Sequence, residues 1–239
     1  MSESDDSRKM SAPRGPGGVR VIAFDLDGTL VDTAPDLIGT LNHVFAQNDV
    51  PPLPYESGRA MIGSGVKVLL QKGLTELRRP FTPEDIDRLF GDYLVHYRAH
   101  IADRSRPFAG VEHALDTLAA QGFRLAVCTN KLEALAKQLL DALEMSHRFA
   151  AICGQDTFKT PKPHPDMLRK TVIMAGGDPA RCVMVGDSVT DIDTAKAAGV
   201  PVIAVDFGYT EHPVSHFSPD RIISHFDQLP DAVQALAPR

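Results

Sequence analysis

The stretch VRVIAFDLDGT, residues 19–29, decides the fold. It joins a short apolar run, expected to be a strand over Val19–Phe24, to a polar turn that contains a glycine. Similar apolar runs recur later in the chain, with helix-like segments between them. The further expected strands are Phe123–Cys128, Phe149–Cys153, Cys182–Val185 and Val200–Val205, and the expected helices are Gly110–Gln121, Leu132–Leu143, Asp166–Ala175 and Thr190–Ala198. This alternation predicts an α/β fold, a doubly wound and mostly parallel sheet with helices on both faces.

The interval 34–105 departs from this alternation. Apolar residues recur there at helical spacing, as at Leu37 and Leu41, and no convincing strand is visible. Because the interval is too long for a loop, we expect an inserted all-helical domain, called the helical insert below. An insertion directly after the first strand lies beside the carboxyl ends of the strands, where open α/β sheets bind ligands, so we expect it to act as a lid. The remaining expected boundaries are a disordered tail at 1–18 and an α/β core at 19–33 and 106–239.

Composition narrows the range of functions. The 239-residue chain has a formal net charge of -6, which disfavours binding of nucleic acid. No apolar run approaches the ~20 residues of a membrane helix, so we expect no membrane partner. Three cysteines without paired spacing suit a reducing compartment better than a disulfide framework. We therefore expect a cytoplasmic globular protein, either a monomer or a homodimer.

Two acids follow the first expected strand. Asp25 and Asp27 are two residues apart, a spacing that points both carboxylates to the same side of extended backbone. Gly28 permits a tight turn and a close approach of the backbone. Two neighbouring carboxylates are destabilising unless a cation neutralises them. The loop therefore predicts an acidic, cation-binding site.

Two further strand ends offer groups that such a site would need. Thr129 and Asn130 bring a hydroxyl and backbone N–H donors, although Thr129 could also cap the following helix. Lys162 lies in a proline-rich loop just before a helix, and Lys159 is the alternative ammonium in that loop. We expect these groups to meet the two acids at one edge of the sheet.

A last strand end adds two more acids. Asp187 and Asp191 are four residues apart after the run that ends at Val185, although Asp191 could be only an acid at the start of a helix. Carboxylate oxygens without Cys or His partners select a hard cation. The expected cofactor is therefore Mg²⁺.

These elements, taken in order, resemble the motifs of the haloacid-dehalogenase superfamily: Asp25-x-Asp27-Gly-Thr, then Thr129, then Lys162, then Gly-Asp187-x-x-x-Asp191. The resemblance covers essentially residues 20–239. It implies the Rossmann-like core of that superfamily, with the helical insert as its cap. An acid two residues after the nucleophile is typical of the phosphatase and phosphomutase branches, and Asp27 occupies that position.

The resemblance also implies a mechanism, the hydrolysis of a small phosphate monoester through an aspartyl-phosphate. Asp25 would attack phosphorus, and Asp27 would protonate the leaving oxygen and then activate water. Lys162 and Thr129, with N–H donors near Asn130, would stabilise the phosphoryl charge. The implied magnesium site comprises Asp25, Asp27 through its backbone carbonyl, Asp187, and Asp191, which is expected to position the metal's waters or Lys162 rather than to bind directly.

Substrate choice is expected to belong to the helical insert. Gly63-Ser64-Gly65 precedes a helical run whose free N–H groups suit a small anion, although these glycines could also form only a tight turn. Arg59 flanks the segment and could add positive charge. Three strings, residues 32–37, Ile62-Gly63-Ser64-Gly65-Val66 and Thr129-Asn130-Lys131, together resemble those of phosphoglycolate phosphatases, which implies 2-phosphoglycolate as the substrate. The alternatives are a phosphatase for a sugar phosphate, a nucleotide or pyrophosphate, a sugar phosphomutase, and a binding module without catalysis.

Overall fold

The computed structural model describes residues 18–236, so the tail expected at 1–18 lies, apart from Gly18, outside the described residues. Six strands form one sheet in the order β5-β4-β1-β6-β7-β8, and every neighbouring pair is parallel. The strands are β1 (Val21–Phe24), β4 (Arg124–Cys128), β5 (Ala151–Cys153), β6 (Cys182–Gly186), β7 (Val202–Val205) and β8 (Arg221–Ile223). The expected α/β fold is confirmed, with β8 as one strand beyond those expected.

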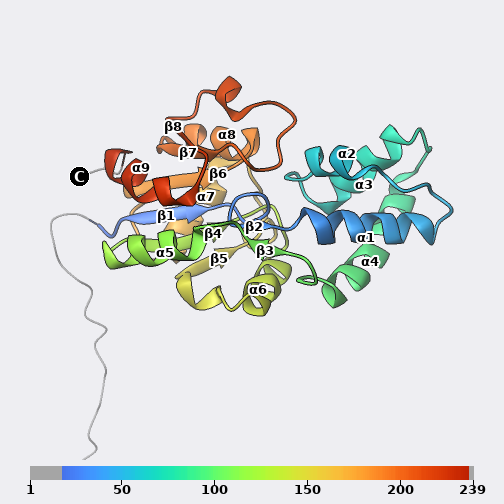
Figure 1. Ribbon diagram of the computed structural model, residues 1–239, viewed down its shortest axis with the longest axis horizontal. Helices are drawn as coiled ribbons and strands as arrows, with labels where there is room; N and C mark the ends of the chain where they lie inside the picture. The colour runs from blue at the N-terminus through green and yellow to red at the C-terminus, as the bar shows by residue number, and fades with distance from the viewer. Residues whose placement is uncertain (1–17, 237–239) are drawn as a thin grey trace, which may run out of the picture.

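Helices cover both faces of the sheet (Figure 1). They are α5 (Val111–Ala120), α6 (Glu133–Ala142) and α9 (Leu229–Leu236) on one face, and α7 (Pro165–Met174) and α8 (Val189–Ala198) on the other. Successive side chains of β1 point to opposite faces. Ile22 and Phe24 are buried with the first group of helices, whereas Val21 and Ala23 are buried with the second. β1 is apolar throughout because it lies in the middle of the sheet and is covered on both sides.

Four further helices occupy the interval of the helical insert. They are α1 (Ala34–Ala46), α2 (Tyr55–Ala60), α3 (Val66–Glu76) and α4 (Pro83–Ala99). α4 packs against α1 and α3, and the buried Tyr93 hydroxyl of α4 donates a 3.0 Å hydrogen bond to the Leu37 carbonyl of α1. Figure 1 shows these helices beside the carboxyl end of β1. They therefore lie next to the loop that carries the first two acids.

A short antiparallel ribbon connects the helical insert to the core. β2 (Val31–Asp32) precedes the insert and pairs with β3 (Arg106–Pro107), which follows it. At the base of α1, Asp36 Oδ2 accepts hydrogen bonds from the backbone N–H and the hydroxyl of Ser105, both at 2.7 Å. The chain therefore leaves the core and returns to it at adjacent points.

Local sequence explains where two of the helices begin. Thr82 and Asp85 form a capping box at the start of α4, in which each side chain accepts a hydrogen bond from the other residue's backbone. Ser188 and Asp191 form the same arrangement at the start of α8. Asp191 thereby has a fixed position at the end of β6, where the sheet meets the helical insert.

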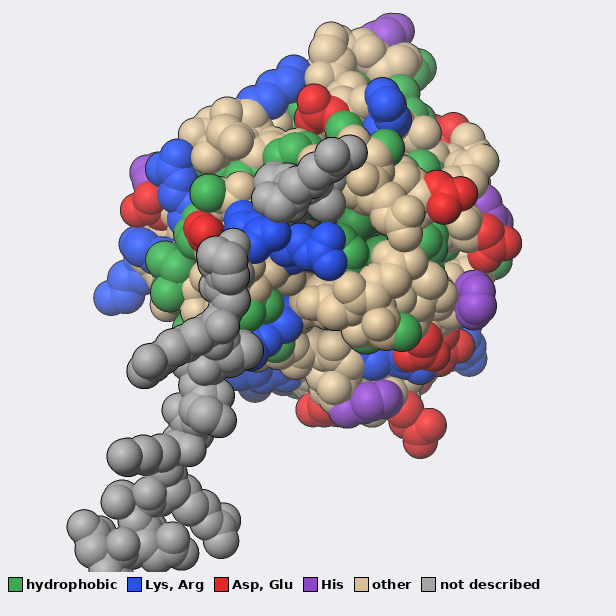
Figure 2. All heavy atoms as spheres, turned by 90° about the vertical axis from the view of Figure 1, so that its left-hand side faces the viewer, with side chains coloured by type: hydrophobic (Ala, Val, Ile, Leu, Met, Phe, Trp, Pro, Cys, Tyr) green, Lys and Arg blue, Asp and Glu red, His purple; other side chains and the backbone are tan. Residues whose placement is uncertain are grey.

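The end of the molecule opposite the helical insert has a mixed surface. Figure 2 shows basic and acidic side chains interspersed over that face. Within the described residues, none of the helices has both the length and the apolar composition that crossing a membrane requires.

Candidate active site

The loop after β1 brings its acids to the carboxyl edge of the sheet. Asp25 is only 4% exposed, and its backbone N–H donates to the Val185 carbonyl of β6 at 2.9 Å. Gly28 has a φ of +85°, a left-handed conformation that this turn requires. A Cβ at Gly28 would also lie 2.5 Å from Asp187 Oδ2. The glycine therefore lets the loop pack directly against the end of β6.

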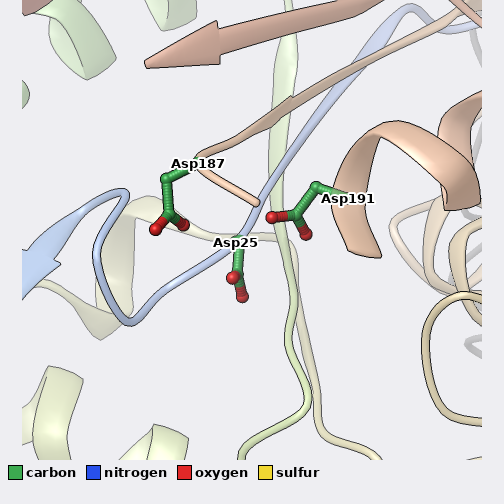
Figure 3. Close-up of side chains that lie close together, drawn as sticks. All are labelled: Asp25, Asp187 and Asp191. Carbon is green, nitrogen blue, oxygen red and sulfur yellow. The ribbon is translucent and has the colours of Figure 1, made fainter. Parts of the chain in front are cut away.

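Three of the expected metal-binding acids lie together. Figure 3 shows Asp25, Asp187 and Asp191 side by side, carried by the end of β1, the end of β6 and the start of α8. One carboxylate oxygen from each residue lies within 4.8 Å of the others, and all three residues are buried. The carboxylate of Asp27 is not part of this group. Two strand-end segments, the loop after β1 and the chain from β6 into α8, thus build one acidic cluster.

Asp187 is held by two neighbouring segments. The Thr29 hydroxyl donates to Asp187 Oδ1 at 2.8 Å, and the backbone N–H of Tyr209 donates to Oδ2 at 2.7 Å. Thr29 belongs to the loop after β1, and Tyr209 belongs to the loop after β7. These bonds fix the carboxylate orientation before any ligand binds.

Lys162, and not Lys159, reaches the acidic cluster. The Nζ of Lys162 lies 2.9 Å from Asp25 Oδ1 and donates a 2.6 Å hydrogen bond to Asp191 Oδ1. Lys159 is exposed. Asp191 also accepts from the hydroxyl of Ser188 in the capping box of α8. Asp191 is therefore a helix-start acid and, at the same time, the residue that holds the Lys162 ammonium.

Burial perturbs the pKa values in this cluster. It raises the pKa of Asp25 to about 6, although the attraction of Lys162 opposes the shift. Burial, with repulsion by Asp191 and Asp25, raises the pKa of Asp187 to about 8. Burial acts to lower the pKa of Lys162, but the attraction of Asp191 and Asp25 outweighs it, so this pKa is raised. The two raised carboxyl pKa values indicate too little positive charge around the ionised acids.

A divalent cation fits this arrangement. Asp25 Oδ1 is buried and accepts no hydrogen bond, although the Lys162 ammonium lies 2.9 Å from it as an ion pair. A buried carboxylate oxygen that accepts no hydrogen bond is stabilised further by a metal cation. The available donors are carboxylate oxygens, which suit hard cations such as Mg²⁺. A cation here would also oppose the effect of burial on the pKa values of Asp25 and Asp187.

The loop after β4 connects the strand ends to one another. Thr129 is 1% exposed, and its Oγ1 accepts a 3.2 Å bond from the Lys131 N–H. Helix α6 has Leu132 as its N-cap residue, so Thr129 does not cap it. The Asn130 side chain accepts from the Lys162 N–H at 2.9 Å and donates to the Lys162 carbonyl at 3.1 Å. Asn130 therefore fixes the backbone that carries the Lys162 ammonium.

A cavity of about 40 Å³ lies between the acids and the helical insert. Asp25 and Asp27 line its core side, and Gly63 and Gly65 line its insert side. The Asn130 amide donates a 3.4 Å bond to the Gly63 carbonyl across the gap. A cavity of this size accommodates only a few water molecules. The helical insert therefore closes tightly over the acids.

Two residues expected to bind substrate lie outside this cavity. Ser64 is exposed between the two glycines. Arg59 of α2 donates a 2.8 Å bond to the Phe207 carbonyl, and its guanidinium carbon lies 5.0 Å from the centre of the Tyr209 ring. Arg59 is therefore turned toward the loop after β7, where it connects the insert to the core.

Lys131 and Tyr97 complete the cavity and were not expected as site residues. Lys131 Nζ donates to the two carboxylate oxygens of Asp27 at 2.9 and 3.1 Å and to the Tyr97 hydroxyl at 2.9 Å. Tyr97 belongs to α4, and its complete burial raises its pKa well above the ordinary range. The sequence did contain a signal for Lys131, because it directly follows Thr129 and Asn130, which were expected in the site. The sequence contained no such signal for Tyr97, because it continues the row of apolar residues along the buried face of α4.

A family model, described as haloacid dehalogenase-like hydrolase, matches residues 22–205, which is more than half of the chain. The chain belongs to the haloacid dehalogenase-like hydrolase family. The family resemblance expected from the four motifs is thereby confirmed. The acids, threonine and lysine of those motifs all lie within the matched segment.

Relatives of this haloacid dehalogenase-like hydrolase are phosphatases by name. The chain is 48% identical over 209 residues to a phosphoglycolate phosphatase from Mesorhizobium japonicum, covering 87% of this chain and 92% of the relative. It is 46% identical over 211 residues to the phosphoglycolate phosphatase of Caulobacter vibrioides, covering 88% and 89%. The crystal structure of a predicted phosphoglycolate phosphatase from Haemophilus somnus has a TM-score of 0.84 and 29% identity, covering 90% of this chain and 98% of that one. The resemblance to phosphoglycolate phosphatases and the enzyme class, phosphoric monoester hydrolase, are confirmed.

Proposed function

We propose that this protein hydrolyses 2-phosphoglycolate to glycolate and phosphate, with Mg²⁺ as cofactor and Asp25 as the nucleophile. The substrate follows from relatives that bear that activity in their names and align over most of the chain. One observation carries the chemistry: the Asp25 carboxylate lies buried beside Lys162, lines the cavity, and has an oxygen without a hydrogen bond. An anionic oxygen in that position is suited to attack on a small phosphate ester.

In the first step, a carboxylate oxygen of Asp25 forms a bond to phosphorus as the bond from phosphorus to the glycolate oxygen breaks. Asp27 gives a proton to the departing oxygen, so glycolate leaves as an alcohol. Both carboxyl groups line the same cavity, which supports these paired roles. The product of the step is an aspartyl-phosphate on Asp25.

In the second step, water attacks the phosphorus of the aspartyl-phosphate. Asp27 accepts a proton from this water, and the bond between phosphorus and the Asp25 oxygen breaks. Inorganic phosphate leaves, and both aspartates return to their starting state. One residue thus acts as acid and then as base.

Charge on the phosphoryl oxygens needs positive partners throughout. The Lys162 ammonium and the Thr129 hydroxyl supply two of them, and the burial of both groups supports this role, because electrostatic interactions are stronger away from water. Asp25, Asp187 and the backbone carbonyl of Asp27 would hold Mg²⁺. When bound, the metal would screen the repulsion between Asp25 and the phosphate. Asp191 would hold Lys162 and the waters of the metal.

The helical insert, residues 34–105, would act as a cap that admits only small esters. The cavity beneath it measures about 40 Å³, and its insert side has few polar groups. The backbone around Gly63 and Gly65 borders the cavity, whereas Arg59 and Ser64 lie outside it. Because this cavity accommodates only a few water molecules, the cap would open to admit even a small ester such as phosphoglycolate. Closure over the ester would then exclude water from the first step.

The direct test is phosphate release from a panel of esters, with and without Mg²⁺. The panel contains phosphoglycolate, several sugar phosphates, nucleoside monophosphates and pyrophosphate. We expect Mg²⁺-dependent hydrolysis, with the kcat/KM for phosphoglycolate well above all others. A different preferred ester would overturn the substrate but keep the reaction. No release from any member would overturn the proposal, and product analysis with a sugar phosphate would then test for a phosphomutase.

A further inference from the structure

Lys131 carries a buried positive charge that the phosphoryl chemistry does not use. Its side chain is 4% exposed, and its Nζ lies 4.7 Å from the centre of the Tyr97 ring. Lys162 supplies the ammonium on the side of Asp25 and Asp191. Lys131 lies instead beside Asp27, the residue that would meet the leaving oxygen. Its charge therefore lies on the leaving-group side of the reaction.

The surroundings of Lys131 leave few alternatives for an anion. Among the described residues that line the cavity, Lys131 is the one cationic side chain. Much of the rest of the lining is apolar, as with Leu37, Val66 and Phe90. A carboxylate taken into an apolar cavity is strongly destabilised unless a charged partner meets it. Besides Lys131, the lining offers an anion only neutral donors, such as the side-chain amides of Asn130 and Gln155. A second anionic group of a substrate would therefore find its charged partner at Lys131.

We propose that Lys131, assisted by Tyr97, binds the carboxylate of the substrate and so selects esters with an anionic leaving group. This inference rests on the proposed function and adds the group that recognises the substrate. In phosphoglycolate a single methylene separates the leaving oxygen from the carboxylate. The Lys131 ammonium, within hydrogen-bond distance of Asp27, lies where that carboxylate would extend.

The hydrogen-bond capacity of the two side chains agrees with this role. A lysine ammonium has three donors, and two of them are spent on the two oxygens of Asp27. One can pass to the substrate while the other keeps Asp27 in place. The Tyr97 hydroxyl accepts from Lys131, and it donates no hydrogen bond to any of the described residues. That hydrogen is available to the carboxylate as well.

The other candidate cations are directed elsewhere. Arg59 is bonded to the Phe207 carbonyl, and Lys67 is an exposed side chain that pairs with Asp87. Neither lines the cavity. Selectivity for an anionic leaving group is therefore assigned to a core residue in contact with α4 of the insert.

The test compares two esters that differ in the carboxylate, phosphoglycolate and ethyl phosphate. We expect the kcat/KM of the wild type for phosphoglycolate to exceed that for ethyl phosphate by about 10²-fold or more. The reason is that ethyl phosphate offers no carboxylate to Lys131. Lys131→Met should reduce this preference by about 10²-fold, mainly because the KM for phosphoglycolate rises. Tyr97→Phe, which changes one hydroxyl, should reduce it about tenfold. Lys137→Met, an exposed lysine of α6, is the matched control and should keep the full preference.

The outcomes separate this inference from the proposed function. A wild type that hydrolyses ethyl phosphate as well as phosphoglycolate overturns the proposed function itself. A wild type with the preference, whose Lys131→Met and Tyr97→Phe variants lose activity equally on both esters, overturns only the inference, because Lys131 then merely positions Asp27. If Lys131→Met fails to fold, judged by circular dichroism, Tyr97→Phe decides alone. An unchanged preference in that variant also overturns the inference.

Discussion

At the scale of single residues, Asp25 experiences two opposing effects. Burial disfavours its ionised form and Lys162 favours it, and the resulting pKa of about 6 lies above the ordinary value of 3.8. Without metal, the folded protein therefore binds this proton more tightly than the unfolded chain does. The free energy of unfolding falls as the pH rises from 3.8 through about 6. The proposed nucleophile is thus a group whose charge destabilises the metal-free fold.

Asp25→Asn should remove activity and leave the fold intact. The amide has no anionic oxygen to attack phosphorus, so we expect kcat to fall by at least about 10³-fold. The amide resembles the neutral carboxyl group, so the Tm of the metal-free variant at about pH 8 should match or exceed that of the wild type. Phosphate release and thermal melts measure the two effects. Asp193→Asn, at an exposed position of α8, should change neither. Turnover retained in Asp25→Asn would show that another group attacks phosphorus.

At the scale of loops and strands, glycines permit the close approach of three segments to the acids. A Cβ at Gly28 would lie 2.5 Å from Asp187 Oδ2, and one at Gly208 would lie 2.1 Å from Asp187 Cβ. A Cβ at Gly186 would lie 2.4 Å from Asp191 Cβ. Since real Cβ atoms do not approach so closely, any larger residue would displace an acid. The loops after β1 and β7 and the last residue of β6 therefore shape the acidic cluster by the absence of side chains.

Gly208→Ala should weaken the metal site without touching a charged group. Asp187 would have to move, so we expect the Mg²⁺ concentration for half-maximal activity to rise by about 10- to 100-fold. A magnesium titration of phosphate release measures this. The matched control is Gly91→Ala in α4, where an added Cβ meets nothing within 4 Å. That variant should keep the magnesium response and gain about 0.5–1 kcal/mol of stability. An unchanged magnesium requirement in Gly208→Ala would contradict the role given to this loop.

Acids at the ends of strands are easier to predict from the sequence than contacts between elements that lie far apart along the chain. The apolar run before Asp25 and its DxDG spacing predict a strand, a turn and an acidic edge, because each depends on neighbouring residues. The pairing of β2 with β3 joins segments over seventy residues apart, and each strand has only two residues, too few for a periodic signal. Contact between Lys131 and Tyr97, like the placement of Arg59, depends on how the helical insert docks. No local pattern specifies that docking.

At the scale of the whole molecule, the acidic cluster would couple the binding of a cation to folding and to pH. Asp187 has a pKa of about 8 in the metal-free fold, against 3.8 ordinarily. Its ionisation therefore lowers the free energy of unfolding as the pH rises from 3.8 through about 8. Below that value, an incoming cation must displace a proton. Above it, the cation meets an ionised carboxylate whose hydrogen-bond donors, the Thr29 hydroxyl and the Tyr209 N–H, are both uncharged.

Mg²⁺ should therefore stabilise the protein more in mild alkali than in mild acid. At a concentration about 100-fold above the dissociation constant, binding adds about 2.7 kcal/mol, which corresponds to a rise in Tm of several degrees. We expect that rise at about pH 8.5 and a clearly smaller one, at the same magnesium concentration, at about pH 6. Thermal melts at the two pH values measure the difference. Asp187→Asn should abolish the rise at both, whereas an equal rise at both in the wild type would contradict this coupling.

The ribbon formed by β2 and β3 places the two ends of the helical insert side by side. A segment whose ends meet in this way can be exchanged as a cassette, because its replacement needs two junctions and leaves every strand of the main sheet unbroken. Chimeras joined at Asp32 and Arg106 would combine this core with the helices of another relative. Such a protein would inherit its reaction and its preference for an anionic leaving group mainly from the parent of the core, and the size of the esters it admits largely from the parent of the helices.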